Sequence, residues 1–470
     1  MAKEKRTSSI DMTSGSPYRL IISFTLPMLL GNIFQQLYNM VDSIVVGNVI
    51  GDQALAAVGT GFPIIYMLSS LFMGIGTGAT VMISQYYGAR DLEKVDHTIN
   101  TIYMALLVGV VPLTLIGVFL SEPLLRLMQT PETILPYAYD YIVTIYMGLS
   151  ATVFYNIVSY QLRAVGDSRT PLYFLIFASL LNVGLDFLFI LYFHMGVAGA
   201  GWATVISQAL AGMGSLLVLL KKFPAMRPKL ADIRWDPVYA MRLVRLGLPM
   251  ALQFSITAIG VMVQQAALNR LGDVAVAAYT AANKMDNLAT QAMVALGTAL
   301  ATFCGQNFGA GRFDRIRTGV KQTMLVTAGY AVVGAVVVIS LAKPLTYLFV
   351  NAQDATPELL GLVEQFIFFQ GVFYIALGAI FCYRNALQGM GYSTLTMIGG
   401  AIELVMRALA AFVLAAAFGY IGVCLSNPAA WVGADLFFIP AYCYLLNKRL
   451  REMQAAPQTE TLLMEQECQE

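Results

Sequence analysis

The sequence is poor in charge. Asp, Glu, Lys and Arg make up only 12% of its 470 residues, whereas hydrophobic residues make up 58%. A soluble globular domain carries about 25% charged residues, so this chain lacks the polar surface that water requires. Its net charge of +1 gives no electrostatic footprint for nucleic acid, and we expect no nucleic-acid partner. We expect the apolar surface to face a lipid bilayer.

Side chains for enzymatic or metal chemistry are also scarce. The two histidines, His97 and His194, neighbour no nucleophile or metal-ligand partner in the sequence. The five cysteines form no CxxC pair, so neither disulfides nor a metal site is expected. The pattern GxxxxGK[ST] is missing, and GIGTGA at 74–79 lies within an apolar run, where glycines predict close helix packing. We therefore predict no enzyme, no catalytic residue and no cofactor.

Long apolar runs recur from end to end. Each reaches about 20 residues or more, which is enough to cross a bilayer as a helix. We predict an all-α integral membrane protein with about 12 transmembrane helices. The predicted spans are 19–49, 54–86, 92–120, 134–160, 170–193, 197–220, 241–270, 275–307, 313–341, 357–388, 392–416 and 420–447.

Lysine and arginine gather in alternate loops. Both tails and the even-numbered loops carry most of the 28 basic residues, whereas the odd-numbered loops hold Arg126, Arg270 and Lys343. Basic loops stay in the cytosol. We therefore expect a multi-pass protein of the cytoplasmic (inner) membrane with both termini in the cytosol.

The two halves of the chain resemble each other. Three motifs of the first half return in the same order in the second. The pairs are LPM (26–28 and 248–250), Gly-Asp (51–52 and 272–273) and GTGATVMISQYYGAR with GTALATFCGQNFGAGR (76–90 and 297–312). Six helices in each half is an even number, so the halves would be related by a pseudo-twofold axis along the membrane normal, with a cavity between them.

This repeat sets the predicted domain organisation. A basic, proline-containing inter-lobe loop, 221–240, separates an N-lobe, 19–220, from a C-lobe, 241–447. Cytosolic tails at 1–18 and 448–470 complete the chain.

A carboxylate stands inside the first predicted span. NMVDSIVVG places Asp42 in an apolar run, where a charge costs on the order of 2.5–3.5 kcal/mol and normally faces a cavity or a partner. The same helix carries a polar stripe at helical spacing. The stripe consists of Asn32, Gln35, Gln36, Asn39, Asp42 and Ser43.

A second carboxylate lies in the fifth predicted helix. Asn182 and Asp186 are four residues apart and share a helix face. With the predicted helix directions, Asp42, Asp186 and Thr204 of the sixth helix all lie roughly 10 Å below the outer surface. Three helices thus bring polar groups to one depth, which predicts a site for a proton or a sodium ion. A structural hydrogen-bond network would explain the same residues.

Several longer motifs resemble those of one family. LPMLLGNIFQQLYNMVDSIVVG, LRAVGDSRTP and NVGLDFLFI followed by GVAGAGWATVISQ are similar to the multidrug and toxic compound extrusion (MATE) family, and the resemblance covers residues 17–447. It implies a two-lobed, twelve-helix fold whose central cavity opens alternately to either side. It also implies an antiporter that exports amphipathic, often cationic drugs or dyes in exchange for protons or sodium. We expect a monomer.

The resemblance implies roles for particular residues. The cation-site aspartate of the family's first helix matches Asp42, the asparagine and aspartate of the fifth match Asn182 and Asp186, and the threonine of the sixth matches Thr204. Asn39, one turn before Asp42, is added to this set. Another branch has acids in helices seven and ten, and GLPMALQFSITAIG and YIALGAIFCYRN contain none, so a C-lobe cation site is not expected. Proton or sodium stays open.

Other polar residues within spans are candidates for the substrate cavity. Aligning the two LPM motifs places Gln264 opposite Asp42, while Lys284 and Asp286 are two residues apart and point to different sides of a helix. The predicted cavity residues are Gln35, Gln36, Gln264, Lys284 and Asp286.

Three further sites concern structure more than transport. Glu403 and Arg407 are four residues apart and predict an internal ion pair. Asp435 has no evident partner. Arg163, at the cytosolic end of the fourth helix, could brace an inner gate, and the turn that follows it contains Asp167.

Two other functions stay open at this point. One is a flippase or exporter of a lipid-linked saccharide or a dedicated metabolite, although a pyrophosphate would want a basic cavity and few basic residues lie within spans. The other is a channel or membrane-embedded enzyme. An internal repeat with carboxylates in only one half favours a carrier over both.

Overall fold

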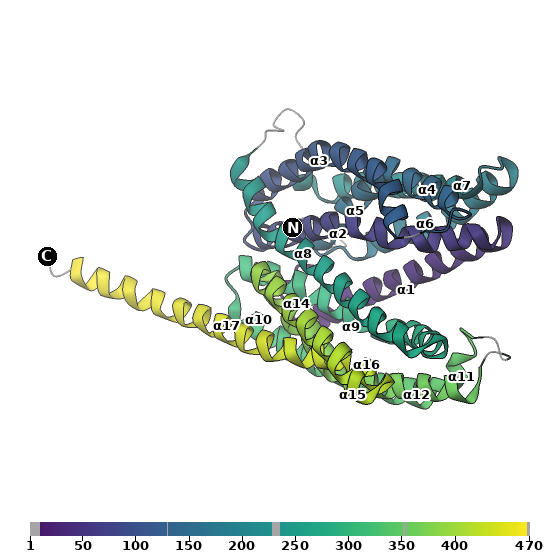
Figure 1. Cartoon of the computed structure of the whole chain (residues 1–470). Coiled ribbons are helices and arrows are strands. Elements are labelled where there is room, and N and C mark those ends of the chain that lie inside the picture. Colours follow the sequence, from purple (N-terminus) through teal and green to yellow (C-terminus); the bar gives the residue numbers. More distant parts are fainter. Residues whose placement is uncertain (1–9, 129, 228–235, 351–352, 354, 468–470) are drawn as a thin grey trace. The chain divides into compact units, whose positions relative to one another are not determined.

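The structure, a computed structural model, describes residues 10–128, 130–227, 236–350, 353 and 355–467, and nearly all of them form helices (Figure 1). The first half contains α1 (Pro17–Val49), α2 (Asp52–Gly88), α3 (Leu92–Leu127), α4 (Leu135–Met147), α5 (Leu149–Ala164), α6 (Arg169–Asp186), the π-helix η1 (Phe187–Tyr192), α7 (Gly196–Lys222) and the short η2 (Pro224–Met226). The second half contains α8 (Pro237–Leu268), η4 (Asn269–Leu271), α9 (Asp273–Gly309), α10 (Phe313–Ser340), α11 (Ala342–Thr346), α12 (Pro357–Val372), α13 (Tyr374–Gly389), α14 (Ser393–Leu409), the π-helix η5 (Ala410–Leu414), α15 (Ala415–Phe418), α16 (Tyr420–Cys424) and α17 (Ser426–Glu467).

The number of membrane-crossing helices agrees with the prediction. Among the described residues, 9 helices are long and apolar enough to cross a bilayer, and the number rises to 12 when each of three bent helix pairs is one span. The all-α membrane class read from composition and apolar runs is therefore confirmed.

Three of the predicted helices are bent where the sequence analysis expected straight, continuous ones. Span 54–86 bends by 46° within α2, between Gln53–Tyr66 and Ser69–Gly88, and the other two are broken into separate helices. Span 134–160 is divided into α4 and α5 with a bend of 52°, and span 357–388 into α12 and α13 with a bend of 48°. The first break lies at Gly148, where a Cβ would come within 2.0 Å of Val205 Cγ2 on α7. Glycine is a poor helix former and its missing Cβ admits the neighbouring helix, so packing and propensity favour a break at the same residue.

The chain folds as two compact units. The first contains residues 22–255, and the second contains Met12–Ile21 together with the chain from Ile256 on. α1 therefore begins in the second unit and continues into the first, while α8 begins in the first and continues into the second. The division into an N-lobe and a C-lobe at 221–240 stays a prediction, and residues 228–235 of that loop lie outside the described residues.

Close helix packing in the first unit depends on glycine. α2 lies against α3, α4 and α5, and α7 lies against α5 and α6. On α2, a Cβ at Gly74 would lie 2.3 Å from the backbone nitrogen of Ala251, and one at Gly78 would lie 2.8 Å from Gly247 Cα. Small residues let helix backbones approach in a membrane. The prediction that GIGTGA serves helix packing is confirmed.

The second unit is built around α9. This helix lies against α10, α12 and α13, and α14 lies against α17. Ala278, Ala281 and Ala282 of α9 are at most 3% exposed. Their small side chains let the neighbouring helices close around α9, and Tyr279 on the same helix meets the ring of Phe366 edge-on at 5.1 Å between centroids.

The internal repeat is visible in the backbone. Gly51 and Gly272 directly precede α2 and α9 with φ values of 119° and 93°, a region that favours glycine. The π-helices η1 and η5 also follow matching helices, α6 and α14. In the first half the residue before the π-helix is Asp186. Turns of this kind are frequent at functional sites.

Both predicted tails are partly structured. Residues 1–9 lie outside the described residues, but Met12 is fully buried and its backbone oxygen accepts from Asn307 Nδ2 at 3.0 Å and Arg315 Nη2 at 3.2 Å. At the other end, α17 continues through most of the predicted tail 448–470 and ends at Glu467.

Candidate functional site

The predicted coupling residues meet within the first unit. Asp42 comes from α1, Asn182 and Asp186 from α6, and Thr204 from α7. Asp42 is 8% exposed, Asn182 and Asp186 are 0% exposed, and the carboxyl groups of Asp42 and Asp186 lie within hydrogen-bonding reach of each other. The sequence analysis predicted that these residues lie at one depth in the membrane, and in the structure their side chains also face one another.

A directed chain of hydrogen bonds leads to Asp186. With its amide nitrogen toward Asp186, Asn182 donates to Asp186 Oδ2 at 3.0 Å and accepts from Thr204 N at 3.1 Å and Thr204 Oγ1 at 3.3 Å. The reverse orientation would face the amide nitrogen with donors only. Because Thr204 Oγ1 donates to Asn182, the hydroxyl of Tyr38, 3.0 Å away, donates to Thr204. The chain of donors fixes one oxygen of Asp186 and leaves the other free.

Two buried oxygens of the site have no hydrogen-bond partner. They are Asp42 Oδ1 and Asp186 Oδ1. An unpartnered polar atom in an apolar interior is costly, and two facing carboxylates repel each other. No group of three or more His, Cys, Asp or Glu gathers among the described residues. Two carboxylates and neutral oxygens from α1, α6 and α7 thus gather in one buried cluster.

The sequence analysis missed two tyrosines at this site. Tyr38 holds Thr204, and Tyr141 of α4 is an electrostatic neighbour of both Asp42 and Asp186. Tyr38 stands four residues before Asp42, so helical spacing could have identified it. Tyr141 comes from a different helix and had no such signal.

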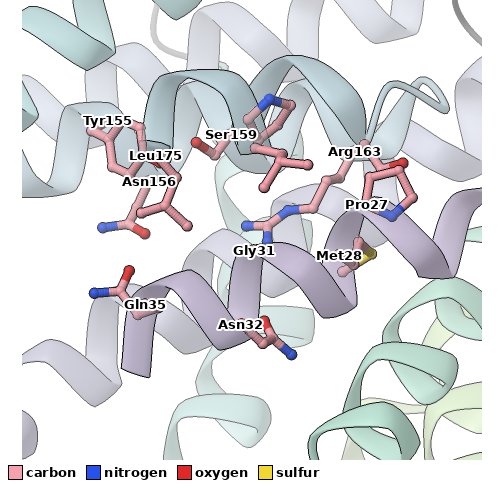
Figure 2. Close-up of a pocket in the computed structure, with 13 residues that line it drawn as sticks. Pro27, Met28, Gly31, Asn32, Gln35, Tyr155, Asn156, Ser159, Arg163 and Leu175 are labelled. Atoms are coloured by element: carbon pink, nitrogen blue, oxygen red, sulfur yellow. The ribbon is translucent and has the colours of Figure 1, made fainter. Parts of the chain in front are cut away.

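A cavity of about 140 Å³ lies beside α1 in the same unit (Figure 2). Its walls come from α1, α5, α6 and the turn between α5 and α6. The lining residues are Pro27, Met28, Gly31, Asn32, Gln35, Tyr155, Asn156, Ser159, Arg163, Ser168, Pro171, Leu172 and Leu175. Apolar and polar side chains both line the pocket, and small-molecule sites commonly combine apolar walls with polar groups that orient the ligand.

Only part of the predicted α1 stripe lines this cavity. Asn32 and Gln35 line it, whereas Gln36 and Asn39 are exposed, and Gln35 Nε2 donates to Asn39 Oδ1 at 3.4 Å. The role of Arg163 in this cavity was missed. The spacing of Tyr155, Ser159 and Arg163 puts them on one face of a helix, but it does not show that this face lines a cavity.

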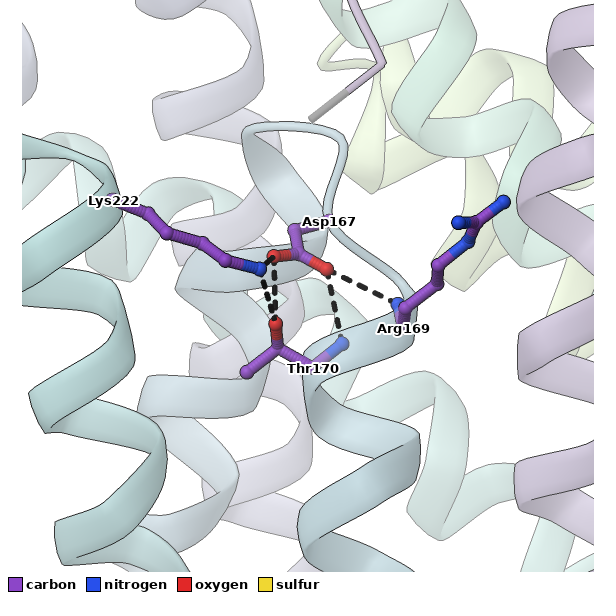
Figure 3. A network of polar contacts seen from close by, with 4 residues as sticks. All are labelled: Asp167, Arg169, Thr170 and Lys222. Carbon is purple, nitrogen blue, oxygen red and sulfur yellow. Dashed lines mark hydrogen bonds and ion pairs between the residues drawn. The ribbon is translucent and has the colours of Figure 1, made fainter. Parts of the chain in front are cut away.

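The turn after Arg163 is held by one buried aspartate (Figure 3). Asp167 Oδ1 accepts from the backbone nitrogens of Arg169 at 3.1 Å and Thr170 at 3.0 Å, which caps α6. Its Oδ2 accepts from Thr170 Oγ1 at 2.7 Å and from Lys222 Nζ, at the end of α7, at 3.1 Å. Asp167 therefore joins two helices and fixes the wall of the cavity at Ser168.

Replacing Asp167 with alanine will lower the stability of the folded protein by about 2 kcal/mol. The change removes an N-cap, typically worth 0.5–2 kcal/mol, and leaves Lys222 without its carboxylate. The measurement is the midpoint of thermal unfolding of the purified protein in detergent.

Asp91→Ala is the matched control, since Asp91 caps α3 through the backbone nitrogen of Lys94 but is exposed to solvent. The hydrogen bond from Lys94 lowers the pKa of the Asp91 carboxyl. Its contribution is therefore present above the ordinary pKa and is lost as pH falls. At neutral pH, equal shifts in the two variants would contradict the role given to Asp167.

The three candidates in the second unit lie in different surroundings. Gln264 is 1% exposed, donates to Val423 O at 3.4 Å and accepts from Tyr279 at 3.3 Å. Asp286 is 7% exposed and accepts from the Tyr374 hydroxyl at 2.8 Å, whereas Lys284 is exposed. Lys284 and Asp286 do point to different sides of α9. Their place in a substrate cavity stays a prediction.

Glu403 makes its close ion pair with Arg384 and not, as predicted, with Arg407, although Arg407 remains an electrostatic neighbour of Glu403. Glu403 Oε1 lies 3.6 Å from Nη1 of Arg384 on α13. Arg407 is 5% exposed and turns toward α8, where a Cβ on Gly260 would lie 2.6 Å from its Nη1. Spacing along one helix permits a contact but does not show which partner a neighbouring helix offers. The sequence analysis found no partner for Asp435, and in the structure Asp435 is an electrostatic neighbour of Glu403.

These features define a class of protein. Long apolar helices in two related halves, with buried carboxylates facing each other in one half, are typical of helical membrane transporters.

Comparison with known proteins gives the family. The MatE family model matches residues 27–188 and 249–421. The chain belongs to the MATE family of multidrug efflux transporters. This confirms the resemblance read from the sequence motifs and the two-lobed, twelve-helix class.

Individual relatives agree. The probable multidrug resistance protein YpnP of Bacillus subtilis is 31% identical over 384 residues, which cover 81% of this chain and 84% of that protein. An FAD transporter of Shewanella oneidensis is 25% identical over 452 residues, with coverage of 94% and 97%. The crystal structure of MATE in complex with MaL6 has a TM-score of 0.87 at 23% identity and covers 95% of this chain and 100% of that chain.

Proposed function

We propose that this protein exports amphipathic, often cationic organic compounds by antiport with protons or sodium ions. The site for the coupling ion is the pair Asp42 and Asp186 with Asn182 and Thr204, and Asn39 lies one turn away. We further propose that it works as a monomer in the cytoplasmic membrane. The distribution of Lys and Arg supports a topology with both termini in the cytosol.

One observation carries this proposal. Asp42 Oδ1 and Asp186 Oδ1 are buried without hydrogen-bond partners, while Asp186 Oδ2 is held by the chain that runs through Asn182, Thr204 and Tyr38. A purely structural network would satisfy these two oxygens as well. A proton shared by the carboxylates, or a sodium ion between them, would satisfy both and remove their repulsion.

The position of the pair suggests how charge would act on the fold. Asp42 lies on α1, a helix that connects the two units, and Asp186 is the last residue of α6 before the π-helix η1. A π-helical turn is a place where a helix can change its register. Neutralising the pair would therefore favour one packing of α1 against α6 over another. Differential affinity of two such states for cation and drug would supply the coupling.

Proteoliposomes loaded with a fluorescent cationic dye test this proposal. With a proton gradient and a sodium gradient imposed separately, one of them will drive dye transport against its concentration gradient, because a single pair of carboxylates serves one ion. Vesicles with no gradient are the control. Transport of no dye under either gradient, by protein shown to be folded, would contradict the proposal.

A dedicated cargo is the second candidate. It is favoured by one relative, which is named an FAD transporter. The same vesicles distinguish the two functions: a multidrug exporter will transport several unrelated dyes, whereas a dedicated exporter will transport none of them and will be inhibited by its own metabolite. A flippase of lipid-linked saccharides would need a more basic cavity than one arginine provides.

A further inference from the structure

The charge of the α1–α5–α6 cavity is unexpected for an exporter of simple cations. Of the 13 residues that line it, Arg163 is the one with a charged side chain, and no carboxylate is among them. A guanidinium keeps its positive charge at every physiological pH. The cavity would therefore repel a purely cationic group and attract an anionic one.

The guanidinium of Arg163 has unused hydrogen-bond donors. Among the described residues it makes no hydrogen bond or ion pair; it lies over the ring of Tyr160, 4.7 Å from Cζ to the centroid, and is an electrostatic neighbour of Tyr155. Stacking on a ring uses the face of the guanidinium and leaves its N–H groups, which lie in the plane, free to donate. Figure 2 shows this group extending from α5 toward α1 near Gly31 and Met28.

Neutral polar groups complete a receptor for an oxyacid. Gln35 of α1 lies across the cavity from Asn156 of α5 (Figure 2), and Asn32 is a further lining residue. An arginine fork binds both oxygens of a carboxylate, and side-chain amides can donate to the lone pairs that remain. Leu172 and Leu175 of α6 form an apolar wall for the rest of a ligand.

The next polar site along α1 has the opposite charge. Asp42 stands ten residues after Asn32, which at 1.5 Å per residue is about 15 Å along the helix. α1 therefore passes two oppositely charged sites of the first unit: Arg163 of α5 near Gly31, and the negative pair that Asp42 forms with Asp186 of α6. This order of charges suits a molecule that carries an anionic and a cationic group.

We propose that the cavity binds the carboxylate of amphipathic and zwitterionic substrates through Arg163. The inference rests on the proposed export function and specifies its substrate class. Arg163 would act as a specificity determinant, so removing its charge would weaken binding of carboxylate-bearing compounds and spare their neutral esters.

The test measures binding of two rhodamine dyes that differ in one group, a free carboxylate or its methyl ester, to the purified full-length protein in detergent. Fluorescence anisotropy gives the dissociation constants. Arg163→Gln will weaken binding of the carboxylate dye by about 10- to 100-fold, the value of a hydrogen-bonded charge, and change ester binding by less than about twofold. Arg163→Lys, which keeps the charge but loses the fork, will fall between the wild type and Arg163→Gln.

Arg169→Gln is the matched control. Arg169 is an exposed arginine at the start of α6, and its guanidinium extends away from the Asp167 network (Figure 3). This variant will bind both dyes as the wild type does. Equal loss of both dyes in Arg163→Gln would show a structural role and overturn the proposal, and so would unchanged binding of the carboxylate dye.

Export assays separate this inference from the proposed function. Gradient-driven export of the ester dye with no carboxylate selectivity at Arg163 would refute the inference and leave the function standing. Selective binding through Arg163 without export of either dye would support the cavity assignment and refute the function.

Discussion

Replacing Asp42 with asparagine will reduce gradient-driven dye export to the level of empty vesicles. The amide has nearly the same shape, but it cannot exchange a proton and cannot offer a negative charge to sodium. The protein will still fold, because the change removes the repulsion between Asp42 and Asp186 and leaves the chain from Tyr38 to Asp186 intact. The measurement is the initial rate of dye transport in proteoliposomes, with thermal unfolding in detergent to check the fold.

Two further variants make this result specific. Asp140→Asn changes an exposed aspartate of α4 in the same way and will transport as the wild type does. Asp186→Asn will lose export like Asp42→Asn, and the double variant will be no worse than either, because residues that act as one unit are not additive. Export by Asp42→Asn at more than about half the wild-type rate would remove Asp42 from the coupling site.

Replacing Gly74 with alanine will destabilise the protein by about 3 kcal/mol, near the upper end for overpacking. The new Cβ would lie 2.3 Å from the backbone nitrogen and 2.4 Å from Cα of Ala251, so no side-chain rotation relieves the contact. α2 and the start of α8 would have to separate. The measurement is the midpoint of thermal unfolding, together with the yield of monodisperse protein.

Gly59→Ala is the control on the same helix. A Cβ at Gly59 would meet nothing within 4 Å, so this variant should gain about 0.5–1 kcal/mol from helix propensity. If Gly74→Ala and Gly59→Ala unfold at the same temperature, the α2–α8 contact does not constrain the fold as described here.

The architecture could be predicted because the bilayer imposes it. Helix length, apolar composition and the distribution of Lys and Arg are properties of single segments, and the lipid environment converts each into a span. The breaks at Gly148 and Phe373 were missed because they depend on contacts with other helices, such as that of Gly148 with Val205.

The cluster proposed as the coupling site could be predicted from the sequence to a greater extent than the cavity. Asp42, Asn182, Asp186 and Thr204 are costly or unusual within spans, so each is visible alone. Arg163 lies near a helix end, where a basic residue is ordinary, and only the packing of α1, α5 and α6 shows that it lines a cavity. For the same reason the pairing of Glu403 could not be read from its own helix.

The second half illustrates the limit of alignment by repeat. Gln264 matches Asp42 in sequence position, and both side chains are buried. Gln264, however, is an amide that is hydrogen-bonded to Val423 and Tyr279. A repeat transmits the backbone path, as the glycines before α2 and α9 show. The repeat does not preserve the side chains, because matching positions in the two halves carry different chemical groups.

The central claim is that one cation moves against drug through Asp42 and Asp186, and its most direct test reverses the cycle. Vesicles with no ion gradient receive an outward dye gradient, and internal pH and sodium are followed with indicators. The account predicts that dye flow drives one of the two ions in the opposite direction in the wild type and drives neither in Asp42→Asn. Dye flow without any counterflow of protons or sodium in the wild type, or equal counterflow in the variant, would contradict it.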